Sequence, residues 1–526
     1  MIGVCGFQWS LSFSTMYTVS LPHGPFLGSR AQEAFVGFSV LGLTLLFSKL
    51  FYNAYLHPLR KFPGPLLARL SRLYYSYYRS TGQLEWKTLE LHKKYGSVVR
   101  IAPNELSFNA GTAWDDIYGH TTKRRSGRRL QKEAFFYLGA VAPNGEKNLG
   151  ASSDEDHSRI RGVLSSAFSE KAVFAQEDLL MRHIGFMVER IRSLNGIPTD
   201  AVRWLHHCTF DITTDLSLGA SAKTLACDEW SPLAHLMFEG IKEGITAVEI
   251  LRFAPFKYQA FSLLIKAFGK ARLEAFQAAI NQAHIRMAQA TTDKEDKKPD
   301  FMSYIIKANK TSKALTPSEI TANVALLLDV GSETTASLLA GCLFYLTKTP
   351  HILEKLTSMI RKDFQTPQEI NSKNLAQNSY LTAVLNEALR IYPPVAGATP
   401  RVTPPEGSQI DGRYVPGNIS VAVNQVAMNR SPKNFTNPDQ FVPGRWLGDG
   451  CFPDDQLQLC QPFSHGPRAC QGRNLAWAEM RLIMGHLLWN FDVELSSESE
   501  NWNSQKTWFI WDKPDLMIRF KSREGQ

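Results

Sequence analysis

The pattern of hydrophobic positions predicts a mostly α protein with a small β-subdomain. Apolar residues recur at spacings of three or four through 66–95, 154–172 and 173–290, as they do on one face of a helix. Strand-like segments are short and are bounded by glycine or proline. They lie at 98–103, 105–108, 413–415 and 419–426.

Near the N-terminus the chain has an apolar run long enough to cross a bilayer. Residues 34–56 form this run, with Lys49 as the charged residue within it. A buried core helix is the alternative interpretation. Basic residues follow the run, which places the body of the protein on the cytosolic side. We therefore predict a lumenal segment at 1–33, a single-pass anchor at 34–56, a stiff proline-rich hinge at 57–65 and the main domain at 66–526.

A second long apolar run, 316–348, predicts a helix that passes through the core. Its middle, 330–335, reads Val-Gly-Ser-Glu-Thr-Thr. Glycine inside a helix costs about 1 kcal/mol relative to alanine, and sequences tend to break local rules at functional sites. The Thr334 hydroxyl can bond the carbonyl four residues back. A kinked core helix with a local hydroxyl cap is the alternative.

Composition narrows the class of protein. The chain has 526 residues, 44% of them hydrophobic, and seven cysteines with no C-x-x-C pair. Sparse, unpaired cysteines suit a reducing compartment rather than a disulfide framework. The net charge of +9 is not gathered into a basic arm, so we expect an anionic membrane surface or an acidic protein partner and no nucleic acid.

One cysteine stands in an unusual loop. Cys470 lies between a glycine- and proline-rich segment, 462–472, and an apolar periodic run that predicts a helix. At a helix N-terminus, backbone N–H groups favour a thiolate. Gly466 and Gly472 would let a bulky group approach the backbone, and Arg468 can meet an anion. The alternatives are an inert buried cysteine, or His465 as a rival ligand.

The pattern Phe463-x-x-Gly466-x-Arg468-x-Cys470-x-Gly472 resembles the haem-binding loop of the cytochrome P450 superfamily. The resemblance implies that Cys470 is the axial thiolate of the iron of haem b. The segment around Glu333 and Thr334 is similar to the family's oxygen-activation segment. This implies that Glu333 supplies protons, that Thr334 orients O₂ and water, and that Gly331 leaves room over the haem.

Further family motifs follow in the expected order from about residue 50 to 520. Glu387-x-x-Arg390 and Arg445 resemble the family's buried charge network, although Gly444 stands where the family usually has an acid. His157-x-x-x-Arg161 and Arg401 resemble the positions that meet the haem propionates, whereas we expect Arg159 to face solvent. The segment 395–399 would line the substrate pocket.

The resemblance implies a haem-thiolate monooxygenase in the endoplasmic reticulum membrane, with electrons from NADPH through a reductase. Arg473 and Arg481 could help to dock that reductase. Segments at 157–161, 168–172 and 428–432 are similar to ascomycete secondary-metabolite members such as the trichothecene hydroxylase group. The expected substrate is therefore a lipophilic terpenoid or polyketide intermediate. The alternatives are a haem-thiolate isomerase, dehydratase or peroxide-driven enzyme, and a non-enzymatic membrane haem-binding protein.

Overall fold

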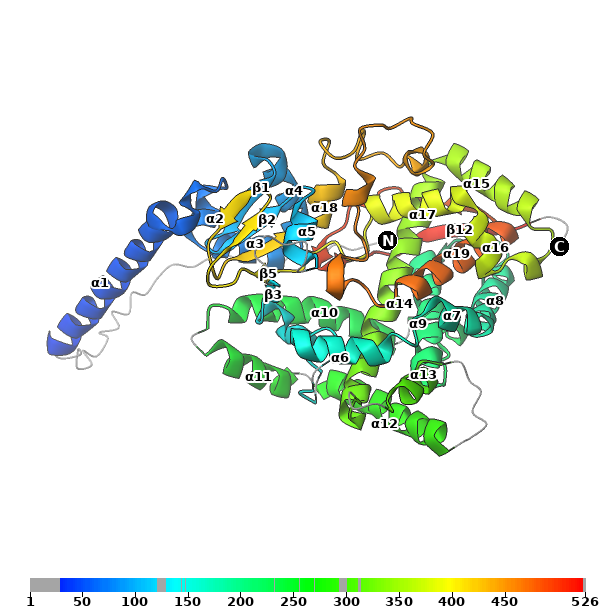
Figure 1. Ribbon diagram of the computed structural model, residues 1–526, viewed down its shortest axis with the longest axis horizontal. Helices are drawn as coiled ribbons and strands as arrows, with labels where there is room; N and C mark the ends of the chain where they lie inside the picture. Colours follow the sequence, from blue (N-terminus) through cyan, green and yellow to red (C-terminus); the bar gives the residue numbers. More distant parts are fainter. Residues whose placement is uncertain are drawn as a thin grey trace, which may run out of the picture.

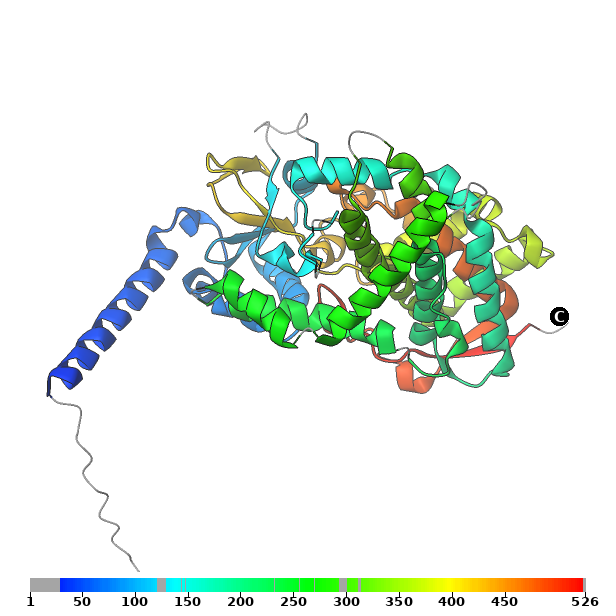
Figure 2. The ribbon, with the colours of Figure 1, turned by 90° about the horizontal axis from the view of Figure 1, so that it is seen from below.

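The computed structural model describes residues 29–523 except 121–128, 143, 147, 231, 255, 269, 293–299 and 311–313. The first described element, α1 (Ser29–Phe51), stands apart from the rest of the molecule (Figures 1 and 2). It continues into a π-helical turn at Tyr52–Leu56. The most apolar 18-residue window of the span Gln32–Leu56 has no buried residue, whereas 72% of the corresponding window in the other candidate span, Pro317–Thr347, is buried. Most of the predicted lumenal segment 1–33 lies outside the described residues.

The predicted hinge is a turn rather than a fully extended connector. A 3₁₀ turn occupies Pro58–Lys61, and the His57 ring accepts a hydrogen bond from the Leu59 backbone N–H. Beyond it, the Arg100 backbone N–H donates to the Pro63 carbonyl at 2.7 Å. The described hinge residues are thus fastened to the first strand of the main domain.

Helices make up most of the main domain, and the predicted helical stretch 66–95 is divided into three. Breaks at 71–72 and 81–83 separate these helices. The helices are α2 (Leu66–Leu70), α3 (Leu73–Ser80), α4 (Leu84–Tyr95), α5 (Ala113–Tyr118), α6 (Asp154–Leu164), α7 (Glu170–Ala175), α8 (Glu177–Ser193), α9 (Ala201–Leu218), α10 (Pro232–Leu251), α11 (Lys257–Phe268), α12 (Lys270–Thr292), α13 (Phe301–Ala308), α14 (Pro317–Thr347), α15 (Pro350–Asp363), α16 (Ser372–Gln377), α17 (Ser379–Ile391), α18 (Gln425–Asn429) and α19 (Arg473–Asn490).

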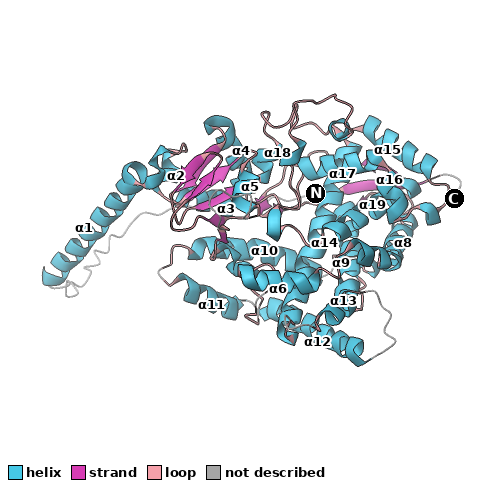
Figure 3. Ribbon diagram, in the orientation of Figure 1, coloured by secondary structure: helices cyan, strands magenta, loops and turns pink. Residues whose placement is uncertain are grey.

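The strands gather mainly near the end of the molecule from which α1 leaves (Figure 3). The largest sheet has the order β1-β2-β8-β5-β3, in which β2 and β8 run parallel and the other neighbours run antiparallel. A second sheet has the order β4-β12-β9, and β6–β7 and β10–β11 form two hairpins. The strands are β1 (Val98–Ala102), β2 (Glu105–Phe108), β3 (Gln131–Lys132), β4 (Thr199–Asp200), β5 (Arg401–Val402), β6 (Ser408–Ile410), β7 (Arg413–Val415), β8 (Ser420–Val423), β9 (Phe491–Leu495), β10 (Thr507–Trp508), β11 (Ile510–Trp511) and β12 (Met517–Ser522).

The helix α14 runs through the helical core, as its apolar pattern predicted (Figure 1). A capping box between Thr316 and Glu319 begins it, because each side chain bonds the other's backbone N–H. It packs along α9, and this contact explains Gly331. A Cβ on Gly331 would lie 2.9 Å from Thr213 Cγ2 of α9. The expectation that Gly331 leaves room over a haem was therefore wrong, since the glycine admits a neighbouring helix.

Candidate active site

The cysteine loop is held in one shape by backbone contacts. The Cys470 N–H donates to the Phe463 carbonyl at 2.8 Å, and a 3₁₀ turn at Gly466–Arg468 lies between them. Gly466 has a φ of +73°, and a Cβ there would lie 2.1 Å from the Tyr118 carbonyl oxygen. Gly466 is therefore required by the backbone of α5. At Gly472 a Cβ would come no closer than 4.0 Å, to Cys470 Sγ.

Two opposing effects act on the Cys470 thiol. Enclosure by protein atoms raises its pKa and is the largest effect, whereas the Gly472 backbone N–H, Arg161 and Arg473 lower it. The helix N-terminus thus acts in the direction predicted, but the protein alone does not favour the thiolate. The residue is nevertheless solvent-accessible. An accessible sulfur surrounded by protein is arranged to meet a ligand that would supply positive charge.

Cationic side chains gather on the strands and the helix next to this loop. The register of β3 and β5 places Lys132 opposite Arg401. Arg468 pairs with Asp154 at the start of α6 at 2.8 Å, and its Nη1 is buried with no hydrogen-bond partner among the described residues. Arg161 of α6 donates to the carbonyl of Ala469, the residue before Cys470, at 2.7 Å.

Burial and neighbouring cations both disfavour additional positive charge in this cluster. Burial, Arg468 and Arg401 lower the pKa of Lys132 to about 6. Burial, Arg468 and Lys132 lower the pKa of His157 to about 3. Asp154 opposes both shifts but does not cancel them. An arrangement of this kind suits a ligand that brings carboxylates of its own.

In the middle of α14, the described side chains point in two directions. Val330 is 47% exposed, although its helix lies in the core. The Thr334 hydroxyl donates to the Val330 carbonyl at 2.9 Å, as its spacing predicted. Glu333 is buried on the other side, between α9 and the segment that follows β11.

Glu333 is tied into an ion pair. Lys513 Nζ donates to its Oε1, Ser337 Oγ donates to the same oxygen at 3.0 Å, and His206 Nε2 lies 3.2 Å from its Oε2. Burial alone would raise the pKa of this carboxyl, but Lys513 and His206 lower it to about 2. In this arrangement Glu333 is a carboxylate and carries no proton to donate.

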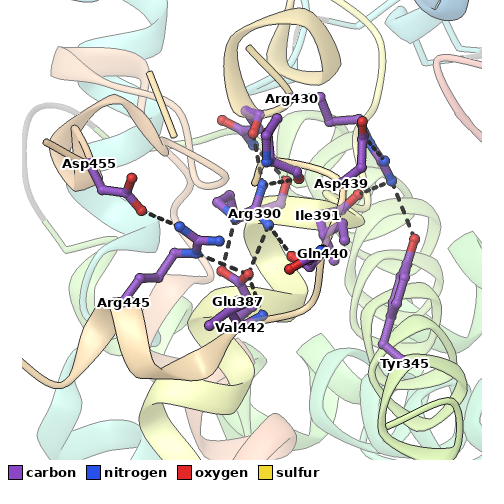
Figure 4. Close-up of polar contacts among 12 residues, drawn as sticks. Tyr345, Glu387, Arg390, Ile391, Arg430, Asp439, Gln440, Val442, Arg445 and Asp455 are labelled. Atoms are coloured by element: carbon purple, nitrogen blue, oxygen red, sulfur yellow. Dashed lines mark hydrogen bonds and ion pairs between the residues drawn. The ribbon is translucent and has the colours of Figure 1, made fainter. Parts of the chain in front are cut away.

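The Glu387 cluster has the connections that the sequence predicted (Figure 4). Arg390 Nε and Nη2 bond the two Glu387 oxygens at 2.9 and 2.8 Å, and Arg445 Nε bonds Oε1 at 3.1 Å. Asp455 pairs with Arg445 from the other side. The acid that Gly444 does not provide thus comes from Asp455, ten residues after Arg445.

Other predicted residues have ordinary contacts. His465 Nε2 lies 2.8 Å from Asp115 Oδ1, which engages the nitrogen of the proposed rival ligand. Arg159 does not simply face solvent, because it pairs with Glu319 at the start of α14. Arg473 is exposed and lies over the Phe463 ring, while Arg481 lies over Trp477.

A family model for cytochrome P450 matches residues 63–520. The chain belongs to the cytochrome P450 family. It is 50% identical, over 90% of this chain and 94% of the relative, to the fusicoccadiene 8-ol C-16 hydroxylase of Alternaria brassicicola. It is 43% identical, over 92% and 97%, to the cytochrome P450 monooxygenase aclL of Aspergillus oryzae. The monooxygenase astA of Talaromyces wortmannii is 37% identical over 93% and 97%.

The chain is therefore a monooxygenase of this family, and the non-enzymatic alternative is set aside. The family implies a haem, a redox partner and a lipophilic substrate. Three features of the structure fit the haem: the accessible Cys470 sulfur, the unpartnered buried Nη1 of Arg468 and the excess of cations around it.

Sequence reasoning missed three residues of the site. Lys132 belongs to no sequence motif. Only the pairing of β3 with β5, which places it opposite Arg401, brings it to the cluster. His206 lies within an ordinary amphipathic helix, and Lys513 follows a hairpin near the C-terminus. No local pattern links either residue to Glu333.

Proposed function

We propose that this cytochrome P450 hydroxylates a lipophilic, terpenoid-type alcohol in a fungal secondary-metabolite pathway, with electrons from NADPH through a reductase. In this reaction one oxygen atom of O₂ enters a C–H bond, and the other leaves as water with two electrons and two protons. The single observation that carries the proposal is the match to a fusicoccadiene 8-ol hydroxylase along nearly the whole chain.

In the proposed site, the Cys470 thiolate would bind the haem iron, and Phe463, Gly466 and Gly472 shape the loop that carries it. When bound, the haem would supply an iron at which O₂ is reduced, with a thiolate that favours O–O cleavage. The cation cluster would hold its carboxylates, and Arg468 is the strongest candidate because one of its buried N–H groups has no described partner. The remaining members are Lys132, His157, Arg161 and Arg401.

The chain's own proton-handling groups lie on α14. The Thr334 hydroxyl is half-buried and donates to the Val330 carbonyl. Its oxygen can still accept a hydrogen bond from a polar group beside Val330. Glu333, one residue before it, would collect protons and pass them toward that hydroxyl. An acid that turns toward this hydroxyl would suit the step, because proton transfer by a positioned group contributes about 10²–10⁴-fold to a rate.

The name of the relative indicates the class of substrate. That name describes a diene alcohol with at least sixteen carbons, hydroxylated at C-16. A largely hydrocarbon molecule suits the exposed face of Val330, which is apolar. Between the terpenoid and polyketide classes, this relative favours the terpenoid.

The proposed location is the endoplasmic reticulum membrane, with α1 and the turn after it as the anchor and the main domain in the cytosol. The exposed span Gln32–Leu56 supports this. Further exposed apolar side chains lie on α2 and α3, at the end of α10, in the α10–α11 connection and on α11, and α3 packs against α10. They are Leu66, Leu67, Leu73, Tyr77, Ile250, Phe253, Phe256 and Leu263.

The test is incubation of the full chain with a fungal reductase, NADPH, O₂ and fusicoccadiene 8-ol. We expect a product that is heavier by one oxygen atom, and ¹⁸O₂ should supply that atom. The variant Thr334→Ala should divert NADPH oxidation from product to hydrogen peroxide. If no terpenoid alcohol gives an oxygenated product, the substrate proposal is wrong. Unchanged turnover without peroxide in Thr334→Ala would instead favour isomerase or dehydratase chemistry.

A further inference from the structure

The ion pair between Glu333 and Lys513 joins two regions that the proposed reaction must coordinate. Glu333 lies in the middle of α14, and Lys513 follows the β10–β11 hairpin, 180 residues away. The side chains of Lys513 and Glu333 are only 3% and 7% exposed. A buried lysine beside a carboxylate is costly to desolvate, so the pair is weak evidence for a purely stabilising role.

The hairpin that leads to Lys513 also contacts the segment predicted to line the substrate pocket. Ile510 forms a β-bridge with Val395, and the Gly397 N–H donates to the Phe509 carbonyl at 2.9 Å. Phe509 has a φ of +78°, which is a strained conformation for a residue with a side chain. From Trp511, a single residue leads to Lys513. A change at 395–397 therefore has a short path to the ion pair.

The charged and titratable groups around Glu333 come from several elements. They are Lys513, His206 of α9 and Tyr392 after α17, whose pKa the Glu333 charge helps to raise. Glu479 of α19 contacts the adjacent Thr335, and burial raises the pKa of Glu479 to about 8. Lys513 thus provides the largest charge effect that favours the Glu333 carboxylate against burial, and His206 acts in the same direction.

We propose that Lys513 is a positioning residue that holds Glu333 ionised and turned away from Thr334, and that substrate contact with 395–397 opens this pair through the β10–β11 hairpin. Protons would then reach Thr334 only when substrate is present. This inference rests on the proposed function, because it gives a purpose to the proton-handling role of Glu333. In the closed pair, His206 Nε2 lies 3.2 Å from the second carboxylate oxygen of Glu333.

The first test reads the ionisation of Glu333 without turnover. Infrared difference spectra are recorded at neutral pH for the full chain and for Lys513→Met, Glu333→Gln and the double variant. We expect a C=O band from a protonated buried carboxyl in Lys513→Met that is absent from wild type and from the double variant. If Lys513→Met shows no such band, the inference is overturned, whatever the substrate is.

The second test measures whether substrate opens the Glu333–Lys513 pair. NADPH oxidation with reductase is measured with and without fusicoccadiene 8-ol. In Lys513→Met, the ratio of the two rates should fall about tenfold, a fraction of the effect of a positioned proton donor, because the substrate-free rate rises. Lys513→Arg should restore most of the ratio, and the double variant should add nothing to Glu333→Gln. A ratio unchanged in Lys513→Met contradicts opening of the pair by substrate.

Lys506→Met is the matched control, since Lys506 is an exposed lysine just before the same hairpin, where it lies over the Trp508 ring. It should leave both the infrared band and the ratio as in wild type.

The reduced, carbon-monoxide-bound spectrum of each variant distinguishes failure of the proposed function from failure of the role proposed for Lys513. A missing haem-thiolate band in wild type would sink the proposed function, whereas a normal band with no effect of Lys513→Met sinks only this inference.

Discussion

Two buried glutamates differ in how firmly the protein holds them. Glu387 accepts five hydrogen bonds, from Arg390, Arg445, the Val442 backbone and Trp446. Glu333 accepts from Lys513 and Ser337 and has one contact with His206. The cations differ as well. Guanidinium groups present fixed forks and keep their charge, while an ammonium is a point charge on a flexible stem that can lose its proton.

The difference separates a permanent structure from a contact that can break. Arg390 also donates to the carbonyls of Asn429, Pro438 and Gln440, so it fastens α17 to the loop that leads to Arg445. The side chains of Glu387, Arg390 and Arg445 are 0% exposed. Lys513 instead lies on an irregular segment between β11 and β12. The first cluster should therefore carry stability, and the second should carry function.

The largest effect is expected for Arg390→Ala. It leaves Glu387 with a single cation and removes the donor to three backbone carbonyls, so we expect a loss of about 3–5 kcal/mol in the free energy of unfolding. Denaturant titration measures this loss, and the fraction of protein that retains haem is determined for the same variant. The matched control is Lys521→Ala, since Lys521 and its partner Glu494 are 50% and 52% exposed. That control should cost less than about 1 kcal/mol. Equal losses would contradict a structural role for the cluster.

The second-largest effect is expected from low pH, which should protonate Glu333. The folded pKa of this group is lowered to about 2 from an ordinary 4.5, so its contribution is present above pH 4.5 and is lost as the pH falls toward 2. We expect at most about 3 kcal/mol over that range. The difference in unfolding midpoint between wild type and Glu333→Gln, measured from pH 5 to pH 3, should therefore shrink with acid. A difference that stays constant would show that the carboxyl is not ionised in the folded state.

An exchange of the cations should affect the two clusters unequally. Arg390→Lys replaces five hydrogen bonds with three at most, and we expect a loss of about 2 kcal/mol. Lys513→Arg keeps the charge and should cost less than that while preserving the substrate dependence of NADPH oxidation. Thermal unfolding of both variants checks this. A greater loss in Lys513→Arg would mean that the second cluster is the more rigid.

The smallest effects come from single neutral donors. Trp446→Phe removes one of five bonds to Glu387, and Ser337→Ala removes one of the few to Glu333. Each should cost about 1 kcal/mol. Only Ser337→Ala should also change the yield of product per NADPH, because Glu333 has fewer donors to keep its position. A changed yield in Trp446→Phe would contradict a purely structural role for the Glu387 cluster.

The sequence predicted those parts of the site that local spacing determines. Glu387 and Arg390 are three residues apart on a helix that ends before Pro393, and Thr334 bonds four residues back, as expected. Contacts between distant segments could not be predicted in this way. Lys513 reaches Glu333 from an irregular segment without periodicity, and Asp455 reaches Arg445 from a loop. Gly331 was misread because a glycine in a helix does not reveal which neighbour it admits.

The proposed mechanism depends on ligation of the haem iron by Cys470. The absorption spectrum of the reduced, carbon-monoxide-bound protein tests this ligation, with wild type compared to Cys470→Ser. We predict a strongly red-shifted Soret band in wild type that is lost in Cys470→Ser. A spectrum typical of histidine-ligated haem in wild type, or the same band in both proteins, would contradict thiolate ligation by Cys470 and the mechanism built on it.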